Sequence, residues 1–463
     1  MESMKQLLLT ILVTGLLTTQ ARAGESYAVV ISKTTAARPE WKAVADALIK
    51  KHTGTLVTYE GSVTNCLPAL TKLQPRYTAF VDAPENIGRV YVTRIHRLTR
   101  QLNDDPYGDT LWGIVSAATP EGALRIANAT EPHLIRSAIG NTGINERWVD
   151  QVFVLSDGEK GRWVLKGADG KVSSGNDGEA DRTKLFVDNF KALQPDLVVG
   201  SGHASERNLE MPFSRGNTVA KDGQWFGMVN WREPVLIPTN NHPRVFLGAG
   251  NCLIGNFQRR ADSMAPTLLA NYGFNQFVGY VVPTWYGKGG WGTYDMWNHL
   301  FGRYSLAEAW FFNNQIIIHD LLTKYPDIAQ RHISVTERGE GIVFDELKGM
   351  GKEASGMLFD RDVVAFYGDP ALRVTFDPKK LPANVDIQVR ERAGSVTITV
   401  TNGEIKEGVR TNLPVCLWLP HRIEKPQLVS GREYDPLVTA NFVMLFKPDY
   451  TSGKRYEIVL RGN

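Results

Sequence analysis

The sequence is poor in cysteine. Cys66, Cys252 and Cys416 are the three cysteines among 463 residues, too few for the dense disulfide framework of a small secreted scaffold. An odd number also leaves at least one thiol unpaired within the chain. Cys66 and Cys416 could pair, or each could be a small buried hydrophobic residue. Cys252 lies among glycines at the end of an apolar run, where a purely structural role is less well explained.

An excess of charge of one sign is also absent. The chain has 52 lysines and arginines against 49 aspartates and glutamates, a formal net charge of +3. The basic residues are scattered, so they form no patch for nucleic acid or an anionic membrane surface, and we expect neither partner. No group of residues has the spacing of metal ligands, and we expect no required cofactor.

A long apolar run is absent after the N-terminal region. Lys5, the apolar residues 7–17 and the small residues around Arg22 follow the pattern of a secretory signal. The run is too short to span a bilayer comfortably, and no later stretch is long and uncharged enough to do so. We expect residues 1–23 to be a signal peptide, and the mature protein to be secreted, periplasmic or at the cell surface rather than integral to the membrane.

Strands and helices alternate along the first part of the mature chain. We predict strands at 27–31, 56–59, 77–81 and 111–115, and helices that begin near Pro39 and Pro120. This β-α-β alternation is typical of a parallel sheet with helices on its faces. The fold class is therefore α/β, with a first subdomain at residues 24–144.

The alternation then restarts in a second α/β subdomain at residues 145–380. We predict strands at 152–155, 197–199, 245–247 and 277–282, with helices between those that lead to His203 and to Cys252. Residues 167–181, rich in Gly, Ser, Asn and Asp, are predicted to be an exposed loop. Oxygen-bearing side chains in this loop could bind calcium, but their spacing matches no calcium loop and a solvated loop is favoured; they are Asp169, Asn176, Asp177, Glu179 and Asp181.

The last part of the chain has a different pattern. From about Asp386, apolar residues alternate with polar ones, as at Val396, Ile398 and Val400. A period of two is the pattern of strands with one buried face. We predict a small all-β sandwich, immunoglobulin-like, at residues 385–463.

Two apolar strands end at residues that can react. The strand at 197–199 leads through glycines to His203, and the strand at 245–247 leads through glycines to Cys252. Since carboxyl ends of parallel strands meet at one edge of a sheet, we expect these residues to be neighbours. An imidazole can take the proton of a thiol and return it to a leaving amine. The backbone amides of Gly202, Ala204 and Cys252 are the predicted oxyanion donors.

Three segments carry a family resemblance. Cys252 begins a Cys-x-x-Gly-x-Phe segment, residues 277–280 lead to the Pro-Thr-Trp-Tyr-Gly segment 283–287, and residues 367–374 contain Gly-Asp-Pro-x-Leu-Arg. Together they resemble the gingipain-like cysteine peptidases, which share a clan with caspases and legumains. His203 precedes Cys252 by about fifty residues, an order and distance similar to those of caspases. Ala204 and Asn251 depart from the clan, which has glycine after the histidine and alanine or serine before the cysteine.

The resemblance implies caspase-like open sheets with flanking helices in two α/β subdomains, followed by the immunoglobulin-like sandwich. It also implies a secreted cysteine endopeptidase that cleaves peptide or protein substrates through an acyl-enzyme on Cys252. In the family an acid from the first subdomain orients the histidine. Asp105 and Asp109 are the candidates here, although a turn built of Asp and Pro explains them equally well.

Two further questions stay open at this stage. Trp285 and Trp291, set among glycines, could form the aromatic wall of a substrate cleft or could be packing residues. A transpeptidase would use the same Cys-His pair, with an amine in place of water. A non-catalytic surface or binding protein would keep the fold and its cleft without a reactive thiol.

Overall fold

A computed structural model describes residues 26–337, 339, 341–381, 385–403, 412–446 and 448–462. The predicted signal peptide, residues 1–23, lies outside the described residues. Within the described ranges, no helix combines the length and the apolar character needed to cross a membrane.

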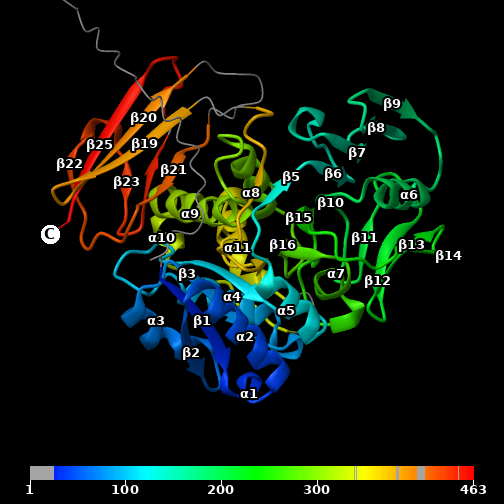
Figure 1. Ribbon diagram of the computed structural model, residues 1–463, viewed down its shortest axis with the longest axis horizontal. Helices are drawn as coiled ribbons and strands as arrows, with labels where there is room; N and C mark the ends of the chain where they lie inside the picture. Colours follow the sequence, from blue (N-terminus) through cyan, green and yellow to red (C-terminus); the bar gives the residue numbers. More distant parts are fainter. Residues whose placement is uncertain are drawn as a thin grey trace, which may run out of the picture.

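A twelve-stranded mixed sheet forms the centre of the molecule (Figure 1). In spatial order its strands are β2 (Thr55–Tyr59), β1 (Tyr27–Ser32), β3 (Tyr77–Val81), β4 (Leu111–Val115), β17 (Val364–Gly368), β16 (Phe274–Tyr280), β15 (Arg244–Asn251), β10 (Leu197–Gly202), β6 (Ser137–Gly140), β7 (Gln151–Leu155), β8 (Arg162–Lys166) and β9 (Val172–Asn176). β17 runs parallel to β4 and antiparallel to β16. The strands from β2 to β17 therefore run in one direction and those from β16 to β7 in the other, with β8 antiparallel to β7. Strands of this sheet alternate with helices along the chain, so the predicted α/β class is confirmed.

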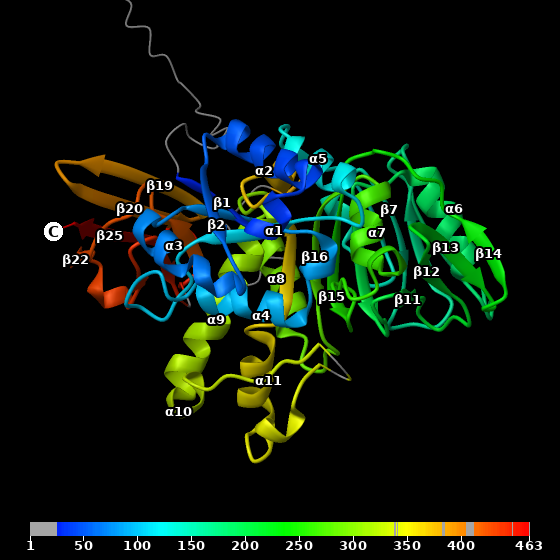
Figure 2. The same cartoon turned by 90° about the horizontal axis from the view of Figure 1, so that it is seen from below.

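Helices cover both faces of this sheet, which is why its central strands are buried on both sides. α2 (Pro39–His52), α5 (Pro120–Asn128) and α7 (Met264–Asn271) pack in a row on one face; α4 (Arg89–Leu98), α8 (Lys288–Asn298), α9 (Leu306–Lys324) and α11 (Lys352–Asp360) lie on the other. Figure 2 shows α2 and α5 above the sheet and α9 and α11 below it. The shorter or peripheral helices are α1 (Lys33–Ala36), α3 (Leu67–Leu73), α6 (Thr183–Leu193) and α10 (Pro326–Ala329).

Local sequence explains where the main helices begin and which face they bury. α2 has Pro39 in its first turn, where proline is tolerated, and buries Trp41, Val44 and Leu48 on one face. α9 begins with a capping box, in which Ser305 and Glu308 each accept a bond from the other's backbone amide. These features confirm the predicted helix near Pro39.

The segment between β10 and β15 corrects the expectation of helices there. It forms a four-stranded antiparallel sheet of β11 (Asn208–Glu210), β12 (Asn217–Lys221), β13 (Gln224–Val229) and β14 (Glu233–Leu236). Asp222 and Gly223, with φ of 50° and 73°, join β12 to β13. Two positive φ angles in a two-residue Asp-Gly loop are typical of a hairpin, not of a helix. This small sheet lies on the opposite side of the molecule from the C-terminal sheets (Figure 1).

The predicted exposed loop at 167–181 is also corrected in part. β9 (Val172–Asn176) lies within it and pairs antiparallel with β8 (Arg162–Lys166). Most side chains of β9 are exposed. The segment is polar because it forms the outermost strand of the large sheet, where a polar composition discourages pairing with other chains.

Two small antiparallel sheets form the C-terminal part. One contains β19 (Val385–Arg392), β20 (Ser395–Asn402), β25 (Arg455–Arg461) and β22 (Gln427–Ser430); the other contains β21 (Val415–Trp418), β24 (Phe442–Leu445) and β23 (Leu437–Val438). Val396, Ile398 and Val400 are buried and alternate with more exposed residues, as predicted. β25, the last strand described, lies beside β20. In an immunoglobulin constant domain this position belongs to the fifth strand and the last strand lies in the other sheet, so the strand order here departs from the predicted immunoglobulin-like one. A two-stranded sheet of β5 (His133–Ile135) and β18 (Val374–Phe376) completes the fold.

A buried aspartate joins the two ends of the α/β region. Asp369, directly after β17, accepts a hydrogen bond of 2.8 Å from the Tyr27 hydroxyl and lies 2.7 Å from both the Lys51 amine and the His52 ring. Burial opposes ionisation of this carboxyl, but His52 and Lys51 outweigh it and hold its pKa well below the usual range. The Gly-Asp-Pro segment therefore anchors β17 to the first strand and the first long helix.

Candidate functional site

His203 and Cys252 follow neighbouring strands at the same edge of the sheet. β10 and β15 are parallel, and their last paired residues are Gly202 and Asn251. His203 and Cys252 are the residues that follow this last pair, so the two leave the sheet at neighbouring positions. His203 is exposed and Cys252 is half-buried. The fold thus gives both residues the strand-end placement that their sequence predicts.

The Cys252 thiol contacts the backbone of Thr284, which follows β16. The Thr284 amide donates to Sγ at 3.3 Å, and the thiol lies 3.5 Å from the Thr284 carbonyl oxygen. An N–H directed at sulfur stabilises negative charge there. The next residue, Leu253, has a φ of 59°, which is uncommon for a side chain other than glycine and marks a sharp turn. This turn presents the thiol at the rim of the sheet.

The other two thiols are in a different environment. All three cysteines are free, and Cys66 and Cys416 are buried. Burial raises the pKa of Cys66 to about 12 and also raises the pKa of Cys416. A thiol that is buried and resists ionisation reacts poorly, so Cys252 is the one cysteine accessible to a reagent.

Two buried asparagines hold the end of the histidine strand. Asn251 donates from Nδ2 to the Gly202 carbonyl oxygen at 3.0 Å. On the other side, Asn141 accepts a 2.9 Å bond from the Ser201 amide. The register of β10 shifts between Gly200 and Ser201, and this irregularity lies between the two asparagines. The segment that carries His203 is therefore fixed from both neighbouring strands.

Of the three predicted oxyanion donors, Gly202 ends β10, Ala204 lies just beyond it, and Cys252 follows β15. Gly202 has a φ of 102°, a conformation that favours glycine, and a side chain there would meet no atom within 4 Å. Beyond it, the Glu210 amide donates to the His203 carbonyl and the Ser205 amide donates to the Asn208 carbonyl. These two bonds lie on either side of an antiparallel bridge between Ala204 and Leu209. At such a position the Ala204 amide is not used for pairing. The geometry is compatible with a donor at Ala204.

The two tryptophans differ in their placement. Trp291 lies on α8, and its indole packs against the end of β15. A Cβ added at Gly250 would lie 2.9 Å from the Trp291 Nε1 atom, and 2.8 Å from the Ser201 hydroxyl of the neighbouring strand. Trp285 directly follows Thr284, is 40% exposed and packs 5.8 Å, ring to ring, from Phe359. Both tryptophans thus come from segments that contact the strands and the turn around Cys252.

A buried carboxylate holds the beginning of α8. Asp360 accepts from the Gly289 amide at 2.7 Å and from the Tyr280 hydroxyl at 3.1 Å. Burial raises the pKa of Asp360 to about 7. Gly290, the next residue of α8, packs so closely on β15 that a Cβ would lie 2.2 Å from the Ala249 carbonyl oxygen. Asp360 therefore positions the helix that carries Trp291.

Asp105 and Asp109 make local contacts. Both accept from the Asn103 side chain, and Asp109 also accepts from the Leu102 amide at 3.0 Å. Burial raises the pKa of both carboxyls, that of Asp109 to about 8. Within the described part of the chain, no hydrogen bond or ion pair joins either residue to His203.

The three aspartates of segment 167–181 are engaged with protein groups. Asp169 pairs with Lys171, Asp177 lies 3.2 Å from Arg182, and Asp181 accepts from the Thr183 amide. Over the described ranges, no group of three or more His, Cys, Asp or Glu side chains is arranged to hold a metal ion.

Sequence reasoning missed two residues that contact the reactive segments, Thr284 and Asn141. Asn141 directly follows β6, so the strand-end rule that singled out His203 and Cys252 would also have found it. Thr284 lies in the Pro-Thr-Trp segment already noted, but only its backbone contacts sulfur. A backbone contact leaves no signal in residue type.

Comparison of the chain with protein-family models, with curated proteins and with solved structures found no match.

Proposed function

We propose that this protein is a cysteine endopeptidase that uses Cys252 as nucleophile and His203 as general base and acid. The observation that carries the proposal is the pairing of β10 with β15, in which Gly202 and Asn251 are register partners. This register makes His203 and Cys252 neighbours at the carboxyl ends of β10 and β15, where the proposed mechanism brings a peptide to both.

The proposed reaction has two steps. His203 takes the Cys252 proton as sulfur attacks the peptide carbonyl, and then gives this proton to the leaving amine as the C–N bond breaks. Water, deprotonated by His203, next attacks the thioester, and the proton returns to the sulfur as the acid leaves. The Ala204 amide is the proposed donor to the oxyanion in both steps. Since neither Asp105 nor Asp109 contacts His203, this mechanism assigns catalysis to two residues.

Two neighbouring features support this assignment. The Thr284 amide donates to the Cys252 sulfur, as a developing thiolate requires. Trp285 follows Thr284 and is 40% exposed, and Trp291 lies against the end of β15, so that each indole can offer apolar surface to a peptide. We include both in the proposed substrate cleft.

Labelling with a library of peptide acyloxymethyl ketones, read out by mass spectrometry, tests the proposal. We expect modification of Cys252 alone, with Cys66 and Cys416 unmodified as internal controls because both are buried. Cys252→Ala and His203→Ala should lose labelling and peptide hydrolysis. His421→Ala is the matched control, since His421 is exposed and pairs with Glu391 far from the site.

The same experiment separates the alternatives. Full peptide hydrolysis by Cys252→Ala would exclude the proposed mechanism. A product joined to an added amine would indicate transpeptidation by the same pair. A folded protein that no probe modifies, with or without calcium, would favour a binding protein that retains only the fold.

A further inference from the structure

A cavity lies away from His203 and Cys252, between the α/β region and the C-terminal sheets. Its volume is about 490 Å³. Its walls come from the starts of β3 and β4, the loop between α8 and α9, the segment after β17, and strands β19 and β21. None of its lining residues belongs to the candidate catalytic site, and a volume of this size is typical of small-molecule sites.

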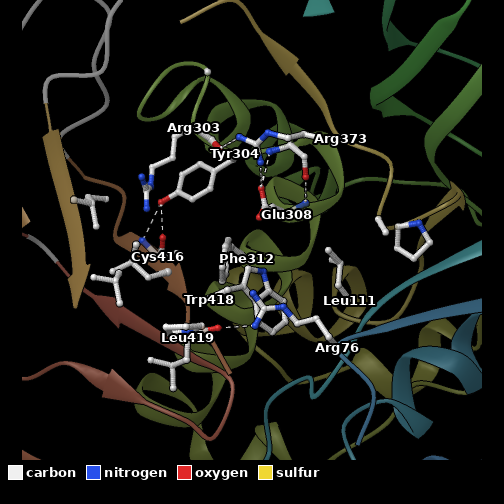
Figure 3. A pocket seen from close by; sticks show the side chains of 18 of the residues that line it. Arg76, Leu111, Arg303, Tyr304, Glu308, Phe312, Arg373, Cys416, Trp418 and Leu419 are labelled. Carbon is white, nitrogen blue, oxygen red and sulfur yellow. Dashed lines mark hydrogen bonds and ion pairs between the residues drawn. The ribbon is translucent and has the colours of Figure 1, made fainter. Parts of the chain in front are cut away.

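The charged side chains of this cavity are unbalanced. Its lining includes three arginines, Arg76, Arg303 and Arg373, and one carboxylate, that of Glu308. Figure 3 shows Arg303 and Arg373 at one side of the cavity and Arg76 at the other. Arg373 lies 3.5 Å from Glu308 and also donates to the Arg303 carbonyl, so Glu308 is already engaged. The cavity therefore carries an excess of positive charge.

Arg303 is the residue best placed to meet a ligand. Its guanidinium has no hydrogen bond or ion pair to any residue of the described ranges, whereas that of Arg76 donates to the Leu419 carbonyl and lies over the Trp418 ring at 4.3 Å. A guanidinium presents a planar array of donors that suits carboxylate or phosphate oxygens. In a partly enclosed cavity this attraction is stronger than in bulk water.

The rest of the wall is apolar. Phe312 and Trp418 line the cavity between the arginines (Figure 3). Ile387 and Val389 line it from β19. A small inorganic anion would leave this apolar surface in contact with water, and a neutral apolar molecule would leave Arg303 without a partner. A ligand with both an anionic group and an apolar body satisfies the two parts of the wall.

We propose that this cavity binds an organic anion, with its carboxylate or phosphate group on Arg303 and its apolar body on Phe312, Trp418 and β19. Because β19 and β21 face the α/β region across the cavity, a bound ligand contacts both parts. It should therefore raise the thermal stability of the whole protein. This inference is independent of the proposed peptidase activity.

Calorimetric titration of the full chain with octanoate tests the site, with octanol and acetate as probes of the apolar and anionic parts alone. We expect saturable binding of octanoate, and binding of octanol and acetate at least about ten-fold weaker. Arg303→Gln should weaken octanoate binding about ten-fold or more. Arg94→Gln is the matched control, since Arg94 is exposed on α4 outside the cavity.

A second variant tests the apolar wall by filling part of the cavity. Val389 is 38% exposed, so Val389→Trp can fold and place its ring in the cavity. We expect it to weaken octanoate binding and to abolish the rise in melting temperature. Equal binding of octanoate and octanol, unchanged affinity in Arg303→Gln, or no saturable binding would overturn the proposal. The same titration of Cys252→Ala should match the wild type, whatever the outcome for peptidase activity.

Discussion

Asn251 donates a hydrogen bond of 3.0 Å from its side-chain nitrogen to the carbonyl oxygen of Gly202, and so joins the ends of β15 and β10. Asn251 directly precedes Cys252, and Gly202 directly precedes His203. The side-chain oxygen of Asn251 is buried and has no partner among the described residues. A buried acceptor without a partner costs free energy. The contribution of Asn251 is therefore to position the two strand ends rather than to stabilise the fold.

Asn251→Ala should separate positioning from stability. We expect the free energy of unfolding to change by less than about 1 kcal/mol, because the lost hydrogen bond and the removed unpaired acceptor offset each other. The labelling rate of Cys252 should fall about ten-fold, with a changed pH profile, since His203 is no longer held. Asn189→Ala, which removes a bond within α6, is the control. A wild-type rate and profile in Asn251→Ala would contradict this role.

Gly202→Ala tests the turn that carries His203. With φ of 102° and open space around a Cβ, the expected cost is backbone strain of about 1–2 kcal/mol, measured by urea unfolding. We also expect slower labelling of Cys252. Gly351→Ala should leave both quantities unchanged, since Gly351 has open space and a φ of −61°. Equal stability of the two variants would show that Gly202 is not required for its conformation.

Asp360→Asn should change how stability depends on pH. An acid whose folded-state pKa is raised, here to about 7, destabilises the fold increasingly as pH rises from about 4 to that value. Asparagine keeps the acceptor oxygen for Gly289 and Tyr280 and does not titrate. The free energy of unfolding of the variant, relative to the wild type, should rise by roughly 1–4 kcal/mol over this range. Parallel curves in urea titrations from pH 4 to 8 would refute this prediction.

Asp369→Asn should have the opposite pH dependence. Because the folded-state pKa of Asp369 is lowered, its stabilisation is complete above the unfolded pKa near 4 and is lost as pH falls below it. At pH 7 we expect a loss of about 3–5 kcal/mol, since Lys51 and His52 lose a buried partner. The difference should shrink in acid. Asp46→Asn is the control, because Asp46 pairs with Lys42 on the exposed side of α2 and should cost little.

Local pattern was sufficient for the main strands and helices. The predicted strands at 77–81 and 111–115 coincide with β3 and β4, and the helix predicted near Pro39 is α2. These elements bury one face or both, so their apolar spacing records their geometry. β9 and β11 were missed because they are short and largely polar, and β12 to β14 because none of them is a long apolar run. Their hairpin pairing depends on turns and neighbours rather than on an apolar stripe.

The candidate site was predictable to a similar extent. His203 and Cys252 were recognisable because each follows an apolar run that ends in glycines. Asp105 and Asp109 were candidates by position in the chain, yet their packing directs them to Asn103 and the Leu102 amide. The direction in which a carboxylate points is decided by neighbours that are distant in sequence or by backbone groups, neither of which leaves a local pattern.

By itself the sequence determined an alternation of buried strands and helices, and the placement of a histidine and a cysteine at two strand ends. The tertiary structure alone decided that β10 and β15 are neighbours in a register that aligns Gly202 with Asn251, and that β17 enters the sheet in the reverse direction. It also brought Asp369 to Tyr27, Lys51 and His52. Burial of a face imposes a period on nearby residues, whereas strand order and long-range ion pairs follow from the packing of the whole chain.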